Sequence, residues 1–142
     1  MRLKSFFTAM VILLGLNLAF AQSDKSYKTI SLAADQALVF DKLIDFLQEE
    51  ELFIQSVDKQ AGFIQAKIYV EDNKFFSSKY GVRKTMNFIV RPKGEKTDIT
   101  LNIYLEENSS SSSRPYYEDK GIIKDVAVYK EIFGKLKLAI EQ

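Results

Sequence analysis

The chain opens with an almost unbroken apolar run over residues 6–20, which follows two basic residues. Small residues around Ala21 end the run, so this stretch has the three parts of an export signal. The pattern predicts that residues 1–21 are a signal peptide and that Gln22 is the new N-terminus. An uncleaved membrane anchor is the alternative, although the run is short for a bilayer span. No cysteine follows the run, so we expect no lipid attachment.

Beyond this run the hydrophobic pattern becomes that of a folded domain. Residues 22–26 are polar and predict a flexible leader, whereas residues 27–142 are expected to form a single α+β domain. Residues 27–32 are rich in strand-forming side chains and predict a first strand. Apolar positions then recur with a helical period over residues 34–51, which predicts a helix. Its apolar stripe is Ala37, Phe40, Leu43, Ile44 and Leu47.

The hydrophobic period changes to two after this helix, which is typical of strands. Four strands are expected, over residues 53–57, 63–70, 83–91 and 96–106. Each of the last three strands has one strongly apolar face. Gly62 lies in the turn between the first two strands, where it is free to take a positive φ. Residues 71–81 are expected to be a polar loop, and residues 92–95 a tight turn.

A serine-rich segment, residues 108–115, follows the last predicted strand. Five consecutive serines bury little apolar area, so we expect this loop to be mobile. From Lys124 onward the period is helical again, with an apolar stripe at Val126, Tyr129, Ile132, Phe133, Leu136 and Ile140. Gly134 lies inside this helix, where glycine costs ~1 kcal/mol relative to alanine. We expect close packing of the helix on the sheet at Gly134 as compensation.

The order of these elements predicts the fold class. The order is a strand, a helix, four strands and a second helix (β-α-β4-α). The last three strands each carry one apolar face, and each helix carries one apolar stripe. The two helices can bury their stripes together only on the apolar side of the sheet. We therefore expect a two-layer α+β domain with a twisted, mainly antiparallel sheet packed on two helices.

Residues 37–68 carry a resemblance to known proteins. An amphipathic helix precedes the sequence from Phe53 to Asp58, which is followed by the sequence from Ala61 to Ala66. This order resembles the helix-grip and TBP-like group of folds. It is similar to small bacterial envelope proteins, both uncharacterised secreted families and, distantly, accessory lipoproteins of the outer-membrane β-barrel assembly machinery. The resemblance implies a periplasmic or secreted location, whereas it brings no site residue, and the lipid-attachment cysteine of those lipoproteins is missing.

The amino-acid composition excludes several classes of catalytic and metal site. The chain has no histidine, cysteine or tryptophan, which excludes thiol nucleophiles, disulfides, His-based catalysis and most zinc, haem and iron–sulfur sites. Its 20 basic and 19 acidic side chains nearly balance, which argues against nucleic acid as a partner. We expect no cofactor, no metal site, no catalytic residue and, once the signal is cleaved, no membrane span.

Two weak catalytic patterns remain. Ser78 and Lys79 are a conceivable nucleophile and base, but adjacent residues rarely converge. Three acidic pairs lie in or beside predicted loops: Glu71 with Asp72, Glu106 with Glu107, and Glu118 with Asp119. Acid–base hydrolysis needs two carboxylates facing each other across a cleft, and calcium needs several oxygen ligands, whereas neighbouring acidic residues are usually solvated.

The sheet face away from the helices is the main candidate binding surface. By alternation it displays Gln65, Lys67, Tyr69, Thr85, Asn87, Ile89, Arg91, Thr100, Asn102 and Tyr104. Within this face we predict that a ligand or partner contacts Tyr69, Asn87, Ile89, Asn102 and Tyr104. The alternative interpretation is a wet face on which tyrosine and threonine are simply good strand formers.

A second candidate is a rim of loop aromatics, made of Phe75, Phe76, Tyr80, Tyr116 and Tyr117. These side chains are either a binding rim or a flap over one end of the sheet. Taken together, the sequence predicts an exported, non-enzymatic binding or assembly module whose partner is an envelope protein, peptide or glycan. The alternatives are a carrier of an apolar small molecule between helix and sheet, and a carboxylate hydrolase. The edge strands also leave a homodimer open.

Overall fold

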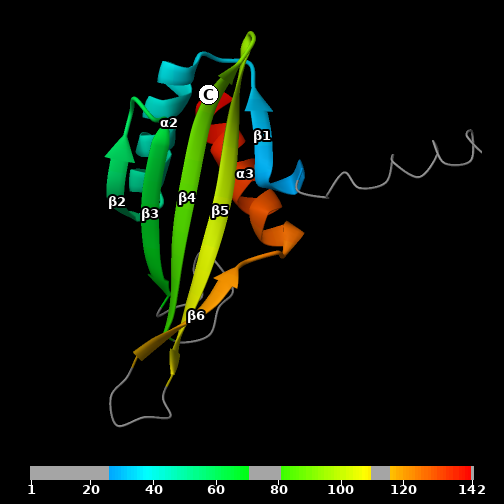
Figure 1. Cartoon of the computed structure of the whole chain (residues 1–142). Coiled ribbons are helices and arrows are strands. Elements are labelled where there is room, and N and C mark those ends of the chain that lie inside the picture. The colour runs from blue at the N-terminus through cyan, green and yellow to red at the C-terminus, as the bar shows by residue number, and fades with distance from the viewer. Residues whose placement is uncertain (1–25, 71–80, 110–115, 142) are drawn as a thin grey trace, which may run out of the picture.

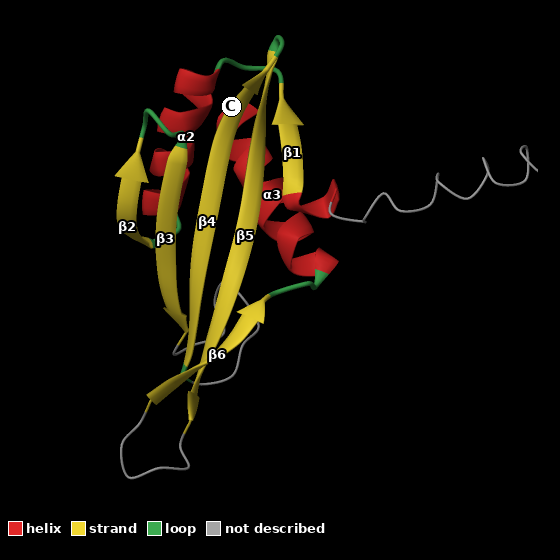
Figure 2. Ribbon diagram, in the orientation of Figure 1, coloured by secondary structure: helices red, strands yellow, loops and turns green. Residues whose placement is uncertain are grey.

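A computed structural model describes residues 26–70, 81–109 and 116–141 of the chain. A short 3-10 helix, Ser26–Lys28, precedes the main elements. These are β1 (Thr29–Leu32), α2 (Gln36–Glu49), β2 (Phe53–Asp58), β3 (Phe63–Val70), β4 (Val82–Lys93), β5 (Lys96–Ser109), β6 (Tyr116–Ile122) and α3 (Val126–Glu141). Figures 1 and 2 show α2 and α3 on the same face of one twisted sheet, which confirms the expected two-layer α+β fold.

All strand pairs of the sheet are antiparallel, in the order β2-β3-β4-β5-β1. The long strand β5 has β4 along one edge. Its other edge is shared, because β1 pairs with residues 97–100 and β6 pairs with residues 104–109. Figure 1 shows these two short strands one after the other beside β5. This arrangement leaves a gap between β1 and β6, next to which the Ile123 N–H donates to the Ile103 carbonyl at 2.9 Å.

The core lies between the helices and the inner face of the sheet. The central strands bury alternate residues, as their period of two predicts: Ile64, Ala66, Met86, Phe88, Val90, Ile99, Leu101 and Ile103. On α2 the buried stripe is rotated from the predicted one, because Ala37 is exposed whereas Val39 and Phe46 are buried. On α3 the stripe is as predicted except at its first position, since Val126 is 39% exposed.

Capping sets the limits of α2, which is shorter than predicted at both ends. The Asp35 side chain accepts a hydrogen bond from the Leu38 N–H at 3.0 Å, so Asp35 is the N-cap rather than part of the helix. At the other end Glu51 has a positive φ of 56°, which is incompatible with a continuing helix. Before α2, Tyr27 and Lys28 belong to the 3-10 helix and not to the first strand.

The two predicted turns are both present. Gly62 has a φ of 63°, as expected, and its carbonyl accepts a hydrogen bond from the Val90 N–H at 2.8 Å. The β4–β5 turn is tighter than predicted, because Lys93 pairs with Lys96 and leaves only Gly94 and Glu95 between the strands. This two-residue connection is common in hairpins, where glycine readily supplies a positive φ.

Strand β6 was not predicted, so the observed order has five consecutive strands between the helices instead of four. Its sequence is polar and contains Gly121, and it lacks the apolar alternation by which strands are recognised. β5 also runs on to Ser109, so Asn108 and Ser109 are strand residues rather than part of a loop. The rest of the serine-rich segment lies outside the described residues.

The expected compensation at Gly134 is wrong. This residue is exposed, and a Cβ atom built on it would meet no atom within 4 Å. The helix therefore carries the cost of glycine without close packing there. The predicted signal peptide and most of its leader lie outside the described residues. Neither of the two helices that are described has the length and apolar character to cross a membrane.

Candidate functional site

The predicted binding face is the outer face of the sheet, opposite the helices. Strand pairing sets its residues in rows, of which one is Gln65, Asn87 and Asn102, and the next is Lys67, Thr85 and Tyr104. Tyr69 and Ile89 lie on the same face, so all five predicted sheet-face residues are together on it. Thr85 differs from the other residues of these two rows because its side chain is buried.

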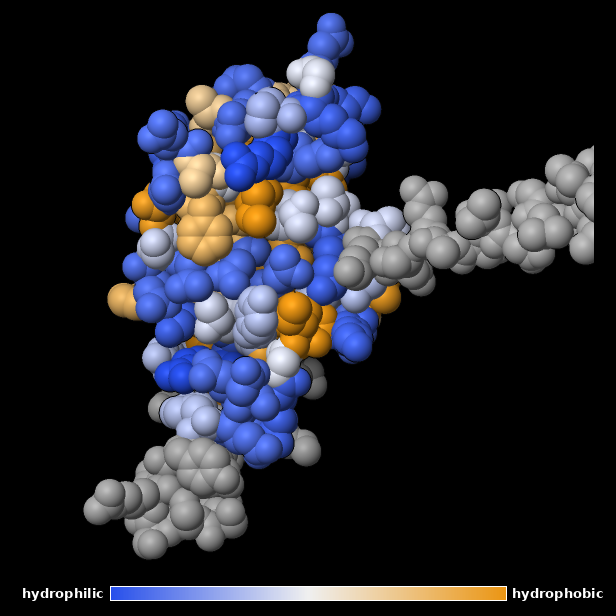
Figure 3. All heavy atoms as spheres, in the orientation of Figure 1, coloured by the Kyte–Doolittle hydropathy of each residue, from blue (hydrophilic) through white to orange (hydrophobic). Residues whose placement is uncertain are grey.

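Most of the outer face is hydrophilic, and Figure 3 shows its hydrophobic atoms in small separate groups. In the middle row the Gln65 side-chain amide donates to the Asn87 oxygen at 2.8 Å, which fixes both side chains. Next to this row Phe63 pairs across the strands with Ile89. The face therefore lacks a continuous apolar patch, and any contact it makes would depend on particular side chains.

One end of the outer face carries a cluster that we call the arginine–tyrosine cluster, made of Tyr69, Arg83, Glu106 and Tyr117. Arg83 donates two hydrogen bonds to the Glu106 carboxylate, one from Nε at 2.6 Å and one from its terminal nitrogen. The guanidinium carbon lies 4.5 Å from the ring centre of Tyr117 and 6.0 Å from that of Tyr69. A two-pronged ion pair and two ring contacts hold the arginine in one orientation.

The tyrosines of this end remain accessible. Tyr69 is 55% exposed, Tyr117 is 40% exposed and the nearby Tyr104 is 38% exposed. The hydrogen bonds from Arg83 lower the pKa of Glu106 below its ordinary value of 4.5, and those to Glu106 raise the pKa of Arg83. Both groups are thus charged at neutral pH, and the cluster presents fixed, exposed rings around a neutralised ion pair.

Sequence reasoning did not select Arg83, and it considered Glu106 only as part of an acidic pair with Glu107. The signal for Arg83 was present, because it is two residues before Thr85 in an alternating strand and must share its face. Its partners depend on register, since pairing puts Arg83 opposite both Tyr69 and Glu106. The pattern of a single strand does not show which residues of the neighbouring strands it pairs with, so these contacts could not be predicted.

The predicted loop rim lies only partly within the described residues. Phe75, Phe76 and Tyr80 lie outside the described residues. Tyr116 is described through its backbone, which pairs with Ser109 in the sheet. Tyr117 belongs to β6 and to the arginine–tyrosine cluster, so this member of the rim joins the outer face.

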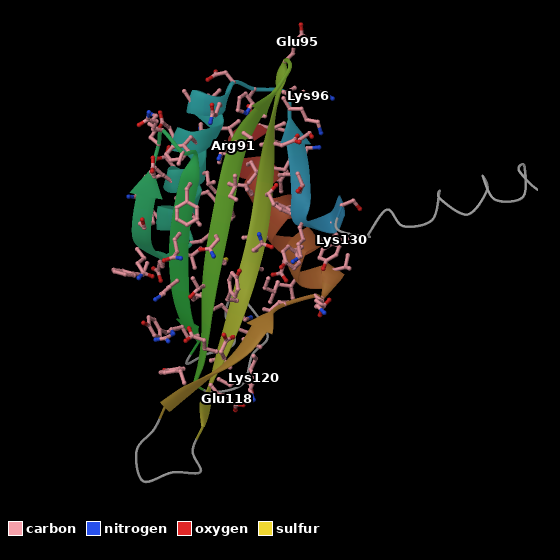
Figure 4. All side chains as sticks on the ribbon, viewed as in Figure 1. Arg91, Glu95, Lys96, Glu118, Lys120 and Lys130 are labelled. Atoms are coloured by element: carbon pink, nitrogen blue, oxygen red, sulfur yellow. The ribbon has the colours of Figure 1, made fainter. Side chains whose placement is uncertain are left out.

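The acidic pairs do not form a catalytic arrangement among the described residues. Glu106 is bound to Arg83, and Glu118 pairs with Lys120 at 2.7 Å on β6 (Figure 4). Asp119 accepts a hydrogen bond from the Gly121 N–H at 2.7 Å. Within residues 26–70, 81–109 and 116–141, no three acidic side chains gather in a way that would hold a metal ion. The remaining acidic pair and Ser78 with Lys79 are outside these ranges.

Three surface cavities lined by described residues are relevant to the small-molecule carrier alternative. One of about 200 Å³ is lined by α2 and Ala139, and one of about 90 Å³ by α2 and Lys59. Neither is lined by a residue of the sheet, so neither is the helix–sheet cavity that a carrier would need. The third, of about 570 Å³, lies at the gap between β1 and β6.

Comparison with known proteins leaves the family open. No protein-family model matches the chain, and no curated protein matches it.

Proposed function

We propose that the protein is an exported, non-enzymatic binding or assembly module of the bacterial cell envelope. The N-terminal pattern of basic, apolar and small residues supports export. The mass of the protein recovered from an envelope fraction tests this part, because cleavage after Ala21 removes the first 21 residues. An intact N-terminus would contradict it.

The arginine–tyrosine cluster is the observation that carries the binding proposal. Tyrosine and arginine are the residue types most enriched at the energetic centres of protein interfaces. Here Arg83 is already neutralised by Glu106 and stacked on Tyr117, so a partner need not order these groups on binding. Exposed tyrosine rings lose little conformational entropy when they are covered.

A protein or peptide is the partner that this surface fits best. The outer face is an open sheet with exposed rings at one end and hydrogen-bonding amides in its middle rows. Such a surface suits an extended contact rather than enclosure of a small molecule. A glycan is the alternative partner, since it would also use ring faces and amides, and the experiment below separates the two.

Replacement of the exposed rings tests the proposal. Immobilised protein is incubated with an envelope extract of the producing bacterium, and bound material is compared with that of a Tyr69→Ala/Tyr104→Ala variant. We expect the variant to stay folded by circular dichroism, because both rings are exposed, and to retain less than about a tenth of the captured partner. Protease treatment of the extract removes a protein partner and leaves a glycan.

The matched control removes two exposed apolar side chains from the helix layer. Leu38 is 47% exposed and Leu138 is 64% exposed, and both belong to helices on the opposite face from the cluster. The Leu38→Ala/Leu138→Ala variant should capture as much partner as the unmodified protein. Equal capture by the tyrosine variant, or an equal loss in the leucine variant, would overturn the assignment of the outer face.

A further inference from the structure

Side chains of three kinds follow one another along β3 and β4 on the outer face. We call them the β3–β4 track, and their order along the strands is Lys67, then Gln65 opposite Asn87, then Phe63 opposite Ile89, then Arg91. The track therefore presents a cation, a pair of amides, an apolar pair and a second cation. Arg91 lies further along β4 than Thr85, the strand partner of Lys67, and a rise of about 3.3 Å per residue separates the two cations by about 20 Å.

The outer face of β3 and β4 has no acidic residue. The acidic residues that register places on the outer face belong to the neighbouring strands. Each of them accepts a hydrogen bond from within the chain: Asp58, Asp98, Glu106 and Asp119. The carboxylates of this face are therefore engaged by the protein itself, and the track between them is cationic at both ends.

Arg91 keeps its guanidinium for a ligand. The residue is exposed, and it makes no hydrogen bond or ion pair with a residue that the structure describes. Its strand partner is Asp98, whose carboxylate is occupied by Ser31 and by Lys93 at 2.9 Å. Figure 4 shows Arg91 near the end of β4 that leads into the hairpin. A guanidinium there can bind a carboxylate with two parallel hydrogen bonds.

Lys67 marks the other end of the track. The hydrogen bonds from Arg83 are the main cause of the lowered pKa of Glu106, and the positive charge of Lys67 adds to the effect. Lys67 itself makes no hydrogen bond or ion pair with any of the described residues. Its ammonium group therefore keeps three N–H donors, close to the arginine–tyrosine cluster.

The middle of the track offers polar and apolar contacts. The Gln65 side chain donates to the Asn87 oxygen at 2.8 Å. This bond leaves the Gln65 oxygen as an acceptor and the Asn87 NH₂ group as a donor for a ligand. Phe63 and Ile89, which are half-buried, provide the apolar pair beside them.

We infer that the β3–β4 track binds an extended acidic segment of a protein, with two carboxylate side chains six positions apart. An extended chain rises by about 3.3 Å per residue and puts alternate side chains on one face, so positions i and i+6 reach the two cations. The side chains at i+2 and i+4 then meet the amide pair and the apolar pair. Charge complementarity selects an acidic segment over a neutral one. This inference rests on the proposed function, because it names the partner chemistry of the same face.

Two end-blocked peptides test the inference, Asp-Ser-Asn-Ser-Leu-Ser-Asp and the reverse sequence, because the track does not fix the direction of the bound chain. The purified protein is titrated with each at constant ionic strength, and backbone amide shifts are followed by NMR. We expect saturable shifts in β3 and β4 with a Kd on the order of millimolar for at least one peptide.

Two control peptides isolate charge and spacing. In one, asparagine replaces both aspartates. In the other, the second aspartate is moved by one position, so that the two carboxylates lie on opposite faces of an extended chain. Both controls should bind at least about tenfold more weakly. The absence of saturation with both aspartate peptides, or equal binding of the asparagine peptide, would overturn the inference.

Variants of the two cations localise the binding. Lys67→Met/Arg91→Met should weaken binding of the aspartate peptide by at least about tenfold and should retain less than about a tenth of the partner captured from the envelope extract. The matched control is Lys130→Met/Lys137→Met, because both lysines are exposed on α3 in the helix layer. Circular dichroism checks that both variants stay folded. Undiminished binding or capture by the Lys67/Arg91 variant would overturn the acidic segment, whereas the proposed function would stand if the Tyr69/Tyr104 variant still lost the partner.

Discussion

At the scale of single residues, two glycines meet opposite surroundings. Gly62 has a φ of 63°, and a Cβ atom there would overlap the carbonyl oxygen of Val90. Gly134 is in the helical interior of α3 and faces open space. The same substitution to alanine should therefore change the stability of the protein in opposite directions at these two positions.

We expect Gly134→Ala to raise the free energy of unfolding by about 1 kcal/mol, because alanine loses less backbone entropy in a helix. Gly62→Ala should lower it by at least about 2 kcal/mol, from the left-handed backbone and the overlap together. Urea unfolding of each variant measures both changes. Gly94→Ala is the control for backbone conformation alone, since Gly94 has a φ of 61° and no atom near its Cβ. A stabilising Gly62→Ala would contradict the turn geometry.

Lys84 is a charged residue on the inner face of the sheet and is only 3% exposed. Burial lowers its pKa from 10.5 to about 8, against the smaller opposing effect of Glu131. The unfolded chain then binds more protons than the folded one between these two values. The burial of this group therefore destabilises the fold fully below pH 8 and less as the pH rises above it.

The corresponding prediction is that Lys84 makes the protein more stable as the pH increases from 8 to 10. Below the pKa of 10.5 in the unfolded state, the gain approaches ~1.4 kcal/mol per pH unit. The Lys84→Met variant should lack this contribution. The free energy of unfolding of the unmodified protein should therefore rise relative to that of the variant as the pH increases from 8 to 10. Parallel pH profiles from urea titrations would show that Lys84 has the same pKa in both states.

At the scale of elements, Tyr129 of α3 bridges the edge of β5 and the segment that follows β6. Its hydroxyl accepts from the Ile103 N–H at 3.4 Å and donates to the Ile123 carbonyl at 2.9 Å, while the Ile123 N–H bonds directly to the Ile103 carbonyl at 2.9 Å. Removal of a buried hydrogen-bond partner costs more than the bond itself contributes, because the remaining groups have lost their contact with water. The hydroxyl thus joins α3 to the sheet.

Tyr129→Phe should lower the free energy of unfolding by about 1–3 kcal/mol. It should also accelerate hydrogen exchange at the Ile103 amide more than at amides in the β3–β4 pair. Tyr27→Phe is the matched control, because the Tyr27 ring packs edge-on against Tyr129 at 5.0 Å and is kept in this variant. Equal effects of both substitutions would show that the Tyr129 hydroxyl contributes nothing specific.

The elements that sequence predicts best are those in which burial acts on one face. β3, β4 and β5 alternate clearly because their inner residues, such as Ile64, Phe88 and Leu101, are fully buried. The sequence did not predict β6. This strand pairs with the end of β5 and buries few apolar side chains, so its sequence lacks the alternation that marks a strand. Helix limits were also missed, since the N-cap role of Asp35 depends on its backbone angles and not on period.

At the scale of the whole molecule, α2 and α3 cover one face of the sheet and leave the other face uncovered by helices (Figure 2). The sequence alone predicts this division, because alternation separates apolar from polar side chains on every central strand. The arginine–tyrosine cluster could not be predicted in the same way. It joins Tyr69, Arg83, Glu106 and Tyr117 from four strands, and only the register of the pairs brings them together.

We propose that the outer face, and not the helix layer, contacts a partner. Site-specific photo-crosslinking in the producing cells tests it most directly, with a benzophenone amino acid in place of Tyr104 or of Leu138. Both side chains are exposed, at 38% and 64%, so each probe reaches solvent. We predict a discrete crosslinked species from position 104 and none from position 138. Crosslinking from position 138 alone, or from neither position, would contradict the account.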